Sequence, residues 1–531
     1  MVDLVADYIV VGGGLTGCTI ASRISRNDNK PHVILLEAGS DATGNAAAAG
    51  FLSGMSLLGG KFDYAYQSEP VSDTANRVHS ISSGKALGGG SILNFGTCQR
   101  ADAADYDQWS EAVGDTRWSY QGLRPWLRKS EHFHGSATDA DEHGFSGPMH
   151  VTSVSASESG QRRYPLREPV KAAWGEVGVV HNLQQRGGTI MGLTELHENS
   201  LDGMRQPSST AYPLDDVKIY TDTVVHKVLF SEKTATGVEL SDGRKVTARK
   251  EVVLCAGAYR TPQILLLSGI GPSATLSHHR IPILYDSPEV GQNLHDHFAV
   301  YFAFRLRDPS LGYALGSASW QNPSLFKYLP WDWVAMQNGR KETFTRCLLS
   351  IVPLAYLVSH LMALISLLQQ CSYYLLPGAQ FRSGLALLTM TQSFSQNYFA
   401  TQLDRDTLIY AARQTLTLML ATSSMTAIVE SETPPSGEGL EGLMPLTADA
   451  SDKEIEDRIR RSGLQHYHSG GTAAMGKVVN TEGEVLGVHG LRIADASIIP
   501  IPLGGHPQAT LYAMAEQLAD MMMKDARKQF S

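Results

Sequence analysis

An apolar run, a glycine-rich break and a mixed apolar and polar stretch open the chain and predict its first elements. Residues 8–11 are apolar and predict a strand, residues 16–26 predict a helix, and residues 32–36 predict a second strand. Strand, turn, helix and strand in this order form a βαβ unit, in which the two strands lie parallel. The pattern therefore predicts an α/β domain at the N-terminus.

Glycines fill the break between the first strand and the helix with the spacing G-x-G-x-x-G, at Gly12, Gly14 and Gly17. The first allows a tight turn, the second lets the backbone approach a pyrophosphate, and the third lets the helix pack closely. Leu15 and Thr16 begin the helix, whose N-terminal amides attract an anion. This spacing predicts a dinucleotide-binding turn.

An acidic residue closes the second strand. Glu37, followed by Ala38, lies about 20 residues beyond the last of these glycines, where a carboxylate can bind both hydroxyls of an adenosine ribose. The complete unit predicts a bound dinucleotide, and both NAD and FAD fit this motif.

Length, composition and charge narrow the class of protein. A chain of 531 residues exceeds what one hydrophobic core usually organises, so we expect either two domains or one large domain with a discontinuous partner. The net charge of −9 at pH 7 comes without a run of Lys or Arg, which argues against a nucleic-acid partner. The expected partner is a small molecule.

Cysteine usage and the N-terminus bear on the compartment. The five cysteines are odd in number, widely spaced and without a C-x-x-C pair. Neither a disulfide framework nor a zinc site is indicated, which favours a reducing compartment. Because the first residues are acidic and strand-like rather than those of a secretory signal, we expect a cytoplasmic protein.

Two glycine-containing segments further along the chain resemble the signatures of a known family. Residues 84–97 read GKALGGGSILNFGT and resemble the first signature of the glucose-methanol-choline (GMC) oxidoreductases. Residues 257–271 read GAYRTPQILLLSGIG and resemble the second. Further blocks at residues 205–212, 290–297 and 468–476 also resemble this family. By these separated matches the chain is identified as a member of the GMC family.

The resemblance implies a fold with two discontinuous domains. It implies an α/β, Rossmann-like FAD-binding domain, similar to that of p-hydroxybenzoate hydroxylase, over residues 1–150, 205–300 and 460–531. It also implies an α+β substrate-binding domain, built on an antiparallel sheet, over residues 151–204 and 301–459.

The resemblance also implies which residues contact FAD. Val225, on a strand predicted for residues 218–229, falls where the family reads the adenine through backbone atoms. Leu93 stands where some relatives carry a histidine bonded to the flavin, so we expect non-covalent FAD. The other positions that match cofactor contacts of the family are Gly90, Asn94, Phe95, Thr97, Asp495, Ala496, Pro507 and Gln508.

Two C-terminal histidines carry the predicted chemistry. By resemblance, His468 in the sequence HSGGT faces the flavin on the substrate side, and His506 in the sequence HPQAT is its partner. An alkoxide gives up hydride more readily than an alcohol, and imidazole titrates near working pH. We therefore assign His468 as the base and His506 as the second contact to the hydroxyl.

The remaining histidines of interest are predicted to have structural roles. Three lie inside family blocks and are interpreted as packing residues: His295, His297 and His489. Four lie in a stretch rich in Gly, Ser and Asp and are interpreted as solvated loop residues: His132, His134, His143 and His150. Their spacing is not that of zinc ligands, so no metal site is expected.

An uncharged segment covers residues 347–381. Its part Leu348–Leu368 is long enough to span a membrane, but a single crossing would separate the two halves of the flavin site. Two crossings need about 40 apolar residues, and the prolines at 353 and 377 interrupt the segment further. Three interpretations stay open: a buried helical hairpin, a patch docked on a membrane or on a second subunit of a homodimer, and an apolar entrance for a lipid-like substrate.

The predicted function is oxidation of an alcohol to a carbonyl compound. Few charged residues are expected near the part of the substrate-binding domain that contains this uncharged segment. We therefore expect an apolar substrate, such as a biosynthetic intermediate, rather than a sugar. The electron acceptor, O2 or another molecule, stays open. The alternatives are an FAD-containing lyase or decarboxylase, an NAD-linked reductase and a catalytically silent binding protein.

Overall fold

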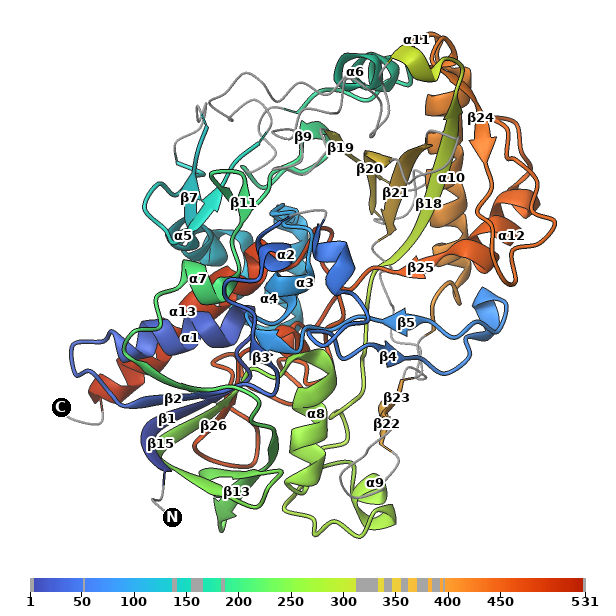
Figure 1. Cartoon of the computed structure of the whole chain (residues 1–531). Coiled ribbons are helices and arrows are strands. Elements are labelled where there is room, and N and C mark those ends of the chain that lie inside the picture. Colours follow the sequence, from blue (N-terminus) through green and yellow to red (C-terminus); the bar gives the residue numbers. More distant parts are fainter. Residues whose placement is uncertain are drawn as a thin grey trace.

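Two seven-stranded sheets organise the chain (Figure 1). The computed structural model describes residues 4–50, 53–135, 141–153, 166–182, 187–311, 333–338, 346–354, 362–369, 381–383, 392–394 and 397–528. One sheet lies in the lower part of Figure 1 with both chain ends beside it, and the other lies in the upper part.

The first sheet has the strand order β12-β2-β1-β15-β14-β13, with β26 paired to β15. The neighbours β12, β2, β1, β15 and β26 run parallel, whereas β14 and β13 are antiparallel. Their bounds are β1 Leu4–Val11, β2 Val33–Leu36, β12 Val217–Tyr220, β13 Val225–Ser231, β14 Thr234–Leu240, β15 Lys245–Leu254 and β26 Leu491–Ile493. This confirms the α/β class predicted from the first motif.

The centre of this sheet is the main core of the molecule. Val10 pairs with Leu35 on one side and Val253 on the other, and all three are buried. Strands buried on both faces carry continuous apolar runs, as these do. Helices α1 (Leu15–Ser25), α5 (Tyr120–Ser130) and α13 (Gln508–Lys528) pack together beside the sheet (Figure 1).

The strand predicted over residues 218–229 is in fact two strands. Strand β12 ends at Tyr220, where its pairing with β2 stops, and Asp222 then takes a left-handed φ of 50°. The amides of Asp222 and Thr223 donate to the carbonyls of Gly39 and Glu37, which turns the chain away from β2. Strand β13 then pairs antiparallel with β14, and the prediction of one continuous strand was wrong.

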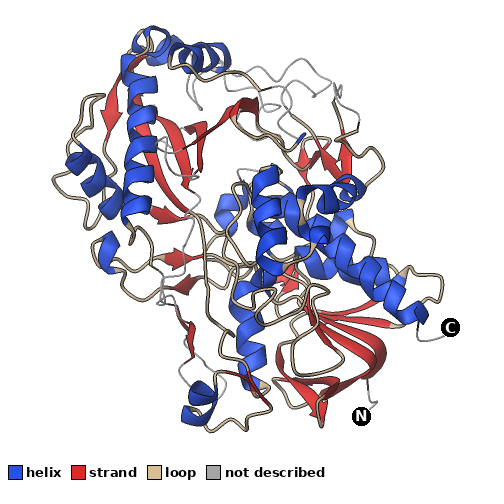
Figure 2. Ribbon diagram, turned by 180° about the vertical axis from the view of Figure 1, so that it is seen from behind, coloured by secondary structure: helices blue, strands red, loops and turns tan. Residues whose placement is uncertain are grey.

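The second sheet is antiparallel and has the order β24-β18-β21-β20-β19-β9, with β25 paired to β18. Helix α10 (Gln402–Ala421) packs along β20, β21 and β24 (Figures 1 and 2). The bounds are β9 Gly192–Glu195, β18 Phe298–Leu306, β19 Trp333–Asn338, β20 Arg346–Leu354, β21 Met362–Gln369, β24 Val429–Thr433 and β25 Leu464–Gln465.

The helical hairpin considered for residues 347–381 was wrong over the part that the structure describes. Strands β20 and β21 pair antiparallel there, with Leu348 opposite Leu368. A short apolar run cannot be assigned to helix or strand by its periodicity, and here the partner strand β18 decides it. Among the described residues, no helix has both the length and the apolarity to cross a membrane. The other two interpretations stay predictions.

Smaller elements connect the two sheets. The remaining helices are α2 Ala46–Ala49, α3 Gly90–Leu93, α4 Ala103–Val113, α6 Arg167–Glu176, α7 Ser208–Ala211, α8 Gly257–Leu267, α9 Ser273–His278, α11 Ser423–Thr426 and α12 Asp452–Ser462. The two-stranded sheets are β3 Ser40–Asp41 with β6 Ala86–Leu87, β4 Tyr66–Gln67 with β5 Ser80–Ile81, β7 Glu131–Phe133 with β8 Met149–Val151, β10 Ser200–Leu201 with β11 Met204–Arg205, β16 Ile270–Gly271 with β17 Tyr285–Asp286, and β22 Phe381–Ser383 with β23 Gln392–Phe394.

The solvated loop predicted around four histidines was wrong at His132, His143 and His150. His132 and His150 lie on β7 and β8, and His134 continues the ladder by donating its amide to the carbonyl of Val151. His143 is buried and its ring stacks on Phe133 with 3.7 Å between ring centroids. The polar composition of this stretch concealed a pair of short strands.

Candidate active site

The glycine turn lies between β1 and α1, against the end of β15. A Cβ on Gly12, which has a φ of 101°, would lie 2.4 Å from the carbonyl oxygen of Cys255. A Cβ on Gly17 would lie 1.9 Å from the carbonyl oxygen of Gly12. Around Gly14, the first residue before the helix, a Cβ would meet nothing nearer than 4.0 Å. The backbone therefore packs tightly against other backbone at Gly12 and Gly17, whereas there is free space beside Gly14.

Glu37 is fixed by the backbone at the end of β2. Its two carboxylate oxygens accept hydrogen bonds from the amides of Gly13 and Gly39, each at 2.7 Å. Burial raises the pKa of this carboxyl to about 7, although the amide donors act in the opposite direction. The side chain is thus held in one orientation, next to the glycine turn.

One cavity collects almost all of the residues predicted from the sequence. All of them line it except Gly17, whose role is to let α1 pack on the turn. The lining residues are Gly12, Gly14, Leu15, Thr16, Glu37, Ala38, Gly90, Asn94, Phe95, Thr97, Val225, His468, Asp495, Ala496, His506, Pro507 and Gln508. Leu93 lines it too.

Hydrogen bonds join the residues that are predicted to contact the cofactor to one another and to neighbouring segments. The Asn94 amide donates to the Gln508 side-chain oxygen at 2.6 Å, which joins the segment after α3 to the start of α13. The Asp495 carboxylate accepts from the Gly257 amide at 2.9 Å and from the Thr261 hydroxyl at 2.6 Å. The C-terminal block is therefore locked to both glycine-containing signatures.

Two polar atoms in the lining test whether FAD fits. The Thr97 hydroxyl and the Gln508 side-chain nitrogen are buried and have no hydrogen-bond partner among the described residues. Buried polar atoms are nearly always paired, so these atoms call for a polar ligand in the cavity. With the open turn at Gly14 and the fixed Glu37, the residues fit a dinucleotide.

Three histidines meet in the same cavity, and we call them the cavity histidines: His466, His468 and His506. Strand β25 brings the first two in, because it pairs with the start of β18 immediately before them. His468 lies next to His506, with 3.3 Å between Nε2 of the former and Nδ1 of the latter. The predicted pair is thus brought together.

His297 fixes the proton positions on His468. Its Nε2 lies 2.9 Å from the carbonyl oxygen of Leu503, which can only accept, so Nε2 carries the proton. In the neutral ring Nδ1 is then an acceptor, and it lies 2.7 Å from Nδ1 of His468. These contacts assign a proton to Nδ1 of His468 and leave its Nε2 as an acceptor. His297 was interpreted as a packing residue, but it also orients the predicted base.

Asp296 holds the backbone around this pair. Its carboxylate accepts from the amide of His468 at 2.7 Å and from the hydroxyls of Ser469 and Tyr398, each at 3.0 Å. Burial raises the pKa of this buried acid to about 6, against the effect of these donors. Its neighbour His295 is buried and packs under Gly470 and Gly471.

His466 is a cavity residue that the sequence reasoning missed. Its Nδ1 lies 3.1 Å from the hydroxyl of Tyr301 on β18. The sequence does contain a signal for this residue, because His466 lies only two residues before the predicted base His468. The Tyr301 contact could not be read from the sequence, since it joins segments 165 residues apart.

Burial keeps these imidazoles neutral. It lowers the pKa of His466 and of His468 well below the usual value, and the charges of neighbouring histidines add to this effect. Burial also lowers the pKa of His506 to about 3 and that of His297 to about 4. At neutral pH the rings in the cavity are therefore uncharged.

A dinucleotide turn, an antiparallel second sheet and a shared cavity with neutral histidines are the features of a dinucleotide-dependent oxidoreductase. Sequence models of the GMC oxidoreductase family match residues 6–299 with the N-terminal part and 389–515 with the C-terminal part. The chain belongs to the GMC oxidoreductase family, and its cofactor is FAD.

Individual relatives match along nearly the whole chain. The GMC-type oxidoreductase acuG of Aspergillus aculeatus is 34% identical over 97% of this chain and 99% of its own length. The oxygen-dependent choline dehydrogenase of Cronobacter sakazakii is 29% identical over 97% of this chain and 94% of its own. A formate oxidase variant of Aspergillus oryzae has the same fold, with a TM-score of 0.86 and 25% identity over all of both chains.

Proposed function

We propose that this chain oxidises an alcohol to a carbonyl compound, with His468 as the base. The observation that carries the proposal is the acceptor atom Nε2 of His468, which the contacts of His297 and Leu503 leave without a proton beside His506. Bound FAD supplies the acceptor for the hydride and its two electrons.

The surrounding residues support this role. A neutral His468 accepts the hydroxyl proton through Nε2, and its Nδ1 proton stays hydrogen-bonded to His297. His506 is placed to hold the same hydroxyl, because its Nδ1 lies 3.3 Å from that Nε2. The carboxylate of Asp296 keeps the His468 backbone in place throughout.

An apolar alcohol is the substrate class that we propose. An apolar cluster of Ile190, Leu196, Ala299 and Met336 packs against Phe95, which lines the cavity, and against Tyr301, which contacts His466. The charged residues in the part of the lining that the structure describes are Glu37, Arg260 and Asp495, all in or beside the dinucleotide-binding segments. This surrounding favours apolar groups over sugars.

FAD is proposed to be held without a covalent bond. Leu93 lines the cavity and is buried, and its side chain offers no nucleophile. Denaturation should therefore release all of the yellow colour from the protein, which gel filtration in guanidinium chloride would check.

Anaerobic titration with a panel of alcohols tests the proposed reaction. Apolar primary and secondary alcohols should bleach the flavin absorbance near 450 nm, and sugars should not. The rate of recovery on admitting air would then separate an oxidase from a dehydrogenase. Bleaching by sugars alone would overturn the apolar substrate. A yellow protein that no alcohol bleaches, yet that converts a substrate without an acceptor, would replace the proposal with a lyase.

A further inference from the structure

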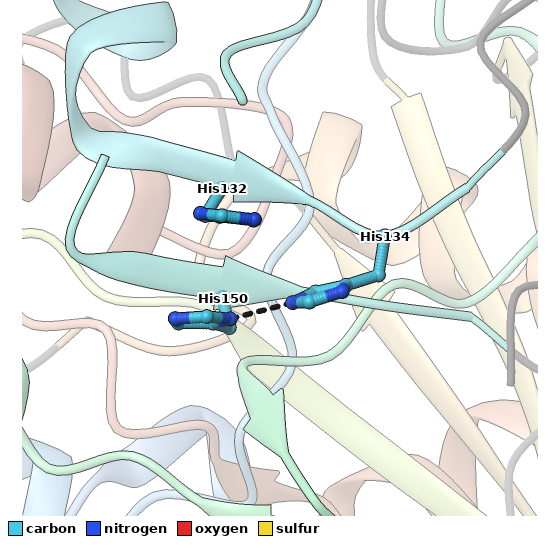
Figure 3. A group of neighbouring side chains, drawn as sticks. All are labelled: His132, His134 and His150. Carbon is cyan, nitrogen blue, oxygen red and sulfur yellow. Dashed lines mark hydrogen bonds between the residues drawn. The ribbon is translucent and has the colours of Figure 1, made fainter. Parts of the chain in front are cut away.

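Three histidines outside the cavity share one face of a small parallel sheet, and we call them the surface histidines: His132, His134 and His150 (Figure 3). Strands β7 and β8 pair in parallel with His132 directly opposite His150. His134 follows two residues after His132 and therefore points to the same side. Glu131 and Phe133, the two neighbours of His132 along the strand, are buried, and they point to the opposite side because side chains alternate along a strand.

The surface histidines are close to one another. Their ring centroids are 4.4 to 4.9 Å apart, and Nε2 of His134 lies 2.5 Å from Nδ1 of His150, the contact that is dashed in Figure 3. One nitrogen from each ring can be chosen so that all three lie within 4.8 Å of one another. None of the three lines the flavin cavity.

We propose that the surface histidines bind one divalent transition-metal cation, with Zn²⁺ as the probe. Three imidazole nitrogens with a fourth position left to water form a known type of zinc ligand set. Imidazole also suits Cu²⁺ and Ni²⁺, whereas Mg²⁺ and Ca²⁺ prefer oxygen ligands. This reverses the sequence expectation of no metal site, because the three ligands come together only through the pairing of β7 with β8.

The geometry requires a small adjustment. Nitrogens bound to one zinc at about 2.0–2.1 Å lie roughly 3.3 Å from one another, so the rings must rotate from their stacked positions. These rings can do so because they are partly exposed to solvent.

Two further features favour a cation here. Asp202 is the acidic group that acts on His150 electrostatically, and its negative charge favours a bound cation. The backbone amide of His150 donates to the Gln206 side chain at 2.8 Å, which anchors the strand that carries this ligand. A bound cation would fasten the end of β7 to β8.

Isothermal titration of the FAD-loaded protein with Zn²⁺ tests this site, using a chain without a polyhistidine tag. The wild type should bind one zinc per chain. His134→Asn and His150→Asn should each weaken that binding at least tenfold. The matched control is the double substitution of His278 and His279 by Asn, which removes two adjacent rings 4.9 Å apart at the surface and should leave binding unchanged.

Folding and competing sites are separated in the same experiment. Circular dichroism and the flavin absorbance show that each variant is folded and loaded, and His134→Asn alters a side chain at the surface. Zinc binding that is unchanged in both His134→Asn and His150→Asn overturns the proposal. So does binding that is lost in His466→Asn instead, because the cavity histidines are the competing group. Absence of stoichiometric binding also overturns it.

Discussion

The cavity histidines and the surface histidines share one sequence pattern and differ in what surrounds them. Each group has two histidines two residues apart and a third from a distant segment. In the cavity, directional contacts to Leu503 and His297 assign the protons of His468. At the surface, the rings stack on one another, and a hydrogen bond joins His134 to His150.

The spacing of histidines in the sequence therefore predicts which rings lie close together, but not what they do. An orienting acceptor and burial give His468 one neutral form, whose Nε2 is an acceptor that faces His506, and this form suits a base. Rings that face solvent and are held mainly by each other suit a cation, because they can turn their nitrogens toward it. The following predictions test each side of this comparison.

The largest effect should follow from His468→Asn. Positioned general bases contribute about 10²- to 10⁴-fold, so anaerobic flavin reduction by an active alcohol should slow by this factor. The exposed His489 is the matched control, because among the described residues it is held by backbone hydrogen bonds to Lys233 and Ala235. If His468→Asn reduces its flavin at a rate within fivefold of that of His489→Asn, His468 is not the base.

His297→Leu should have the next largest effect. It removes the acceptor for the Nδ1 proton of His468, and a hydrogen bond of this kind is worth about 1–3 kcal/mol when its partner stays buried. The rate of flavin reduction at saturating alcohol should fall about 10- to 100-fold, with little change in KM. His297→Asn keeps an acceptor near this position and should recover part of the rate. Equal losses in both variants would point to packing instead.

Thr97→Val should weaken FAD binding by roughly 2- to 10-fold. Its hydroxyl is buried without a partner among the described residues, and a neutral hydrogen bond to the cofactor would contribute about 0.5–1.5 kcal/mol. Thr415→Val is the control, since that hydroxyl is also buried without a partner among the described residues but belongs to α10. Fluorescence of released FAD measures both, and equal effects would show that the cavity atom does not bind cofactor.

The pH dependence should reveal the burial of the base. Because burial lowers the pKa of His468, the proton-accepting form persists as the pH falls below 6.5. The kcat/KM at pH 6.0 should stay within about twofold of its value at pH 7.5, whereas a base with the usual pKa of about 6.5 would lose about fourfold. An acidic limb centred at or above pH 6.5 would contradict the assignment. The pKa that describes this acidic limb of the pH profile belongs to the interacting histidines together rather than to one ring.

The smallest effect should be the rise in the unfolding temperature of the protein when zinc binds to the surface histidines. Zinc at about 100 times its Kd contributes about 2.7 kcal/mol, which should raise the midpoint of unfolding by roughly 2–5 °C. His134→Asn should show no such rise at the same zinc concentration. A rise of the same size in this variant would place the metal elsewhere.

Local backbone requirements explain what the sequence predicted well. The turn at Gly12 and Gly17 needs glycine because a Cβ would strike the backbone, so the motif marks the cavity before any contact is known. Asn94 and His468 were reached through segments that resemble a family. The structure brings these distant segments into one cavity.

Long-range pairing explains what the sequence did not reveal. The link between His297 and His468 joins residues 171 positions apart, and the ligand face of β7 and β8 exists only in their paired register. The apolar run of β20 and β21 suits a helix as well as a strand until β18 is placed beside it. Short-range patterns carry no information on such partners.

Chemical rescue of His468→Ala would show whether His468 acts as the base. Stopped-flow absorbance near 450 nm would follow anaerobic flavin reduction by an active alcohol, with and without added imidazole. The rate should fall at least about 100-fold below the wild type and be restored in part by imidazole, in proportion to its neutral form. If the His468→Ala protein reduces its flavin at the wild-type rate without imidazole, His468 is not the base.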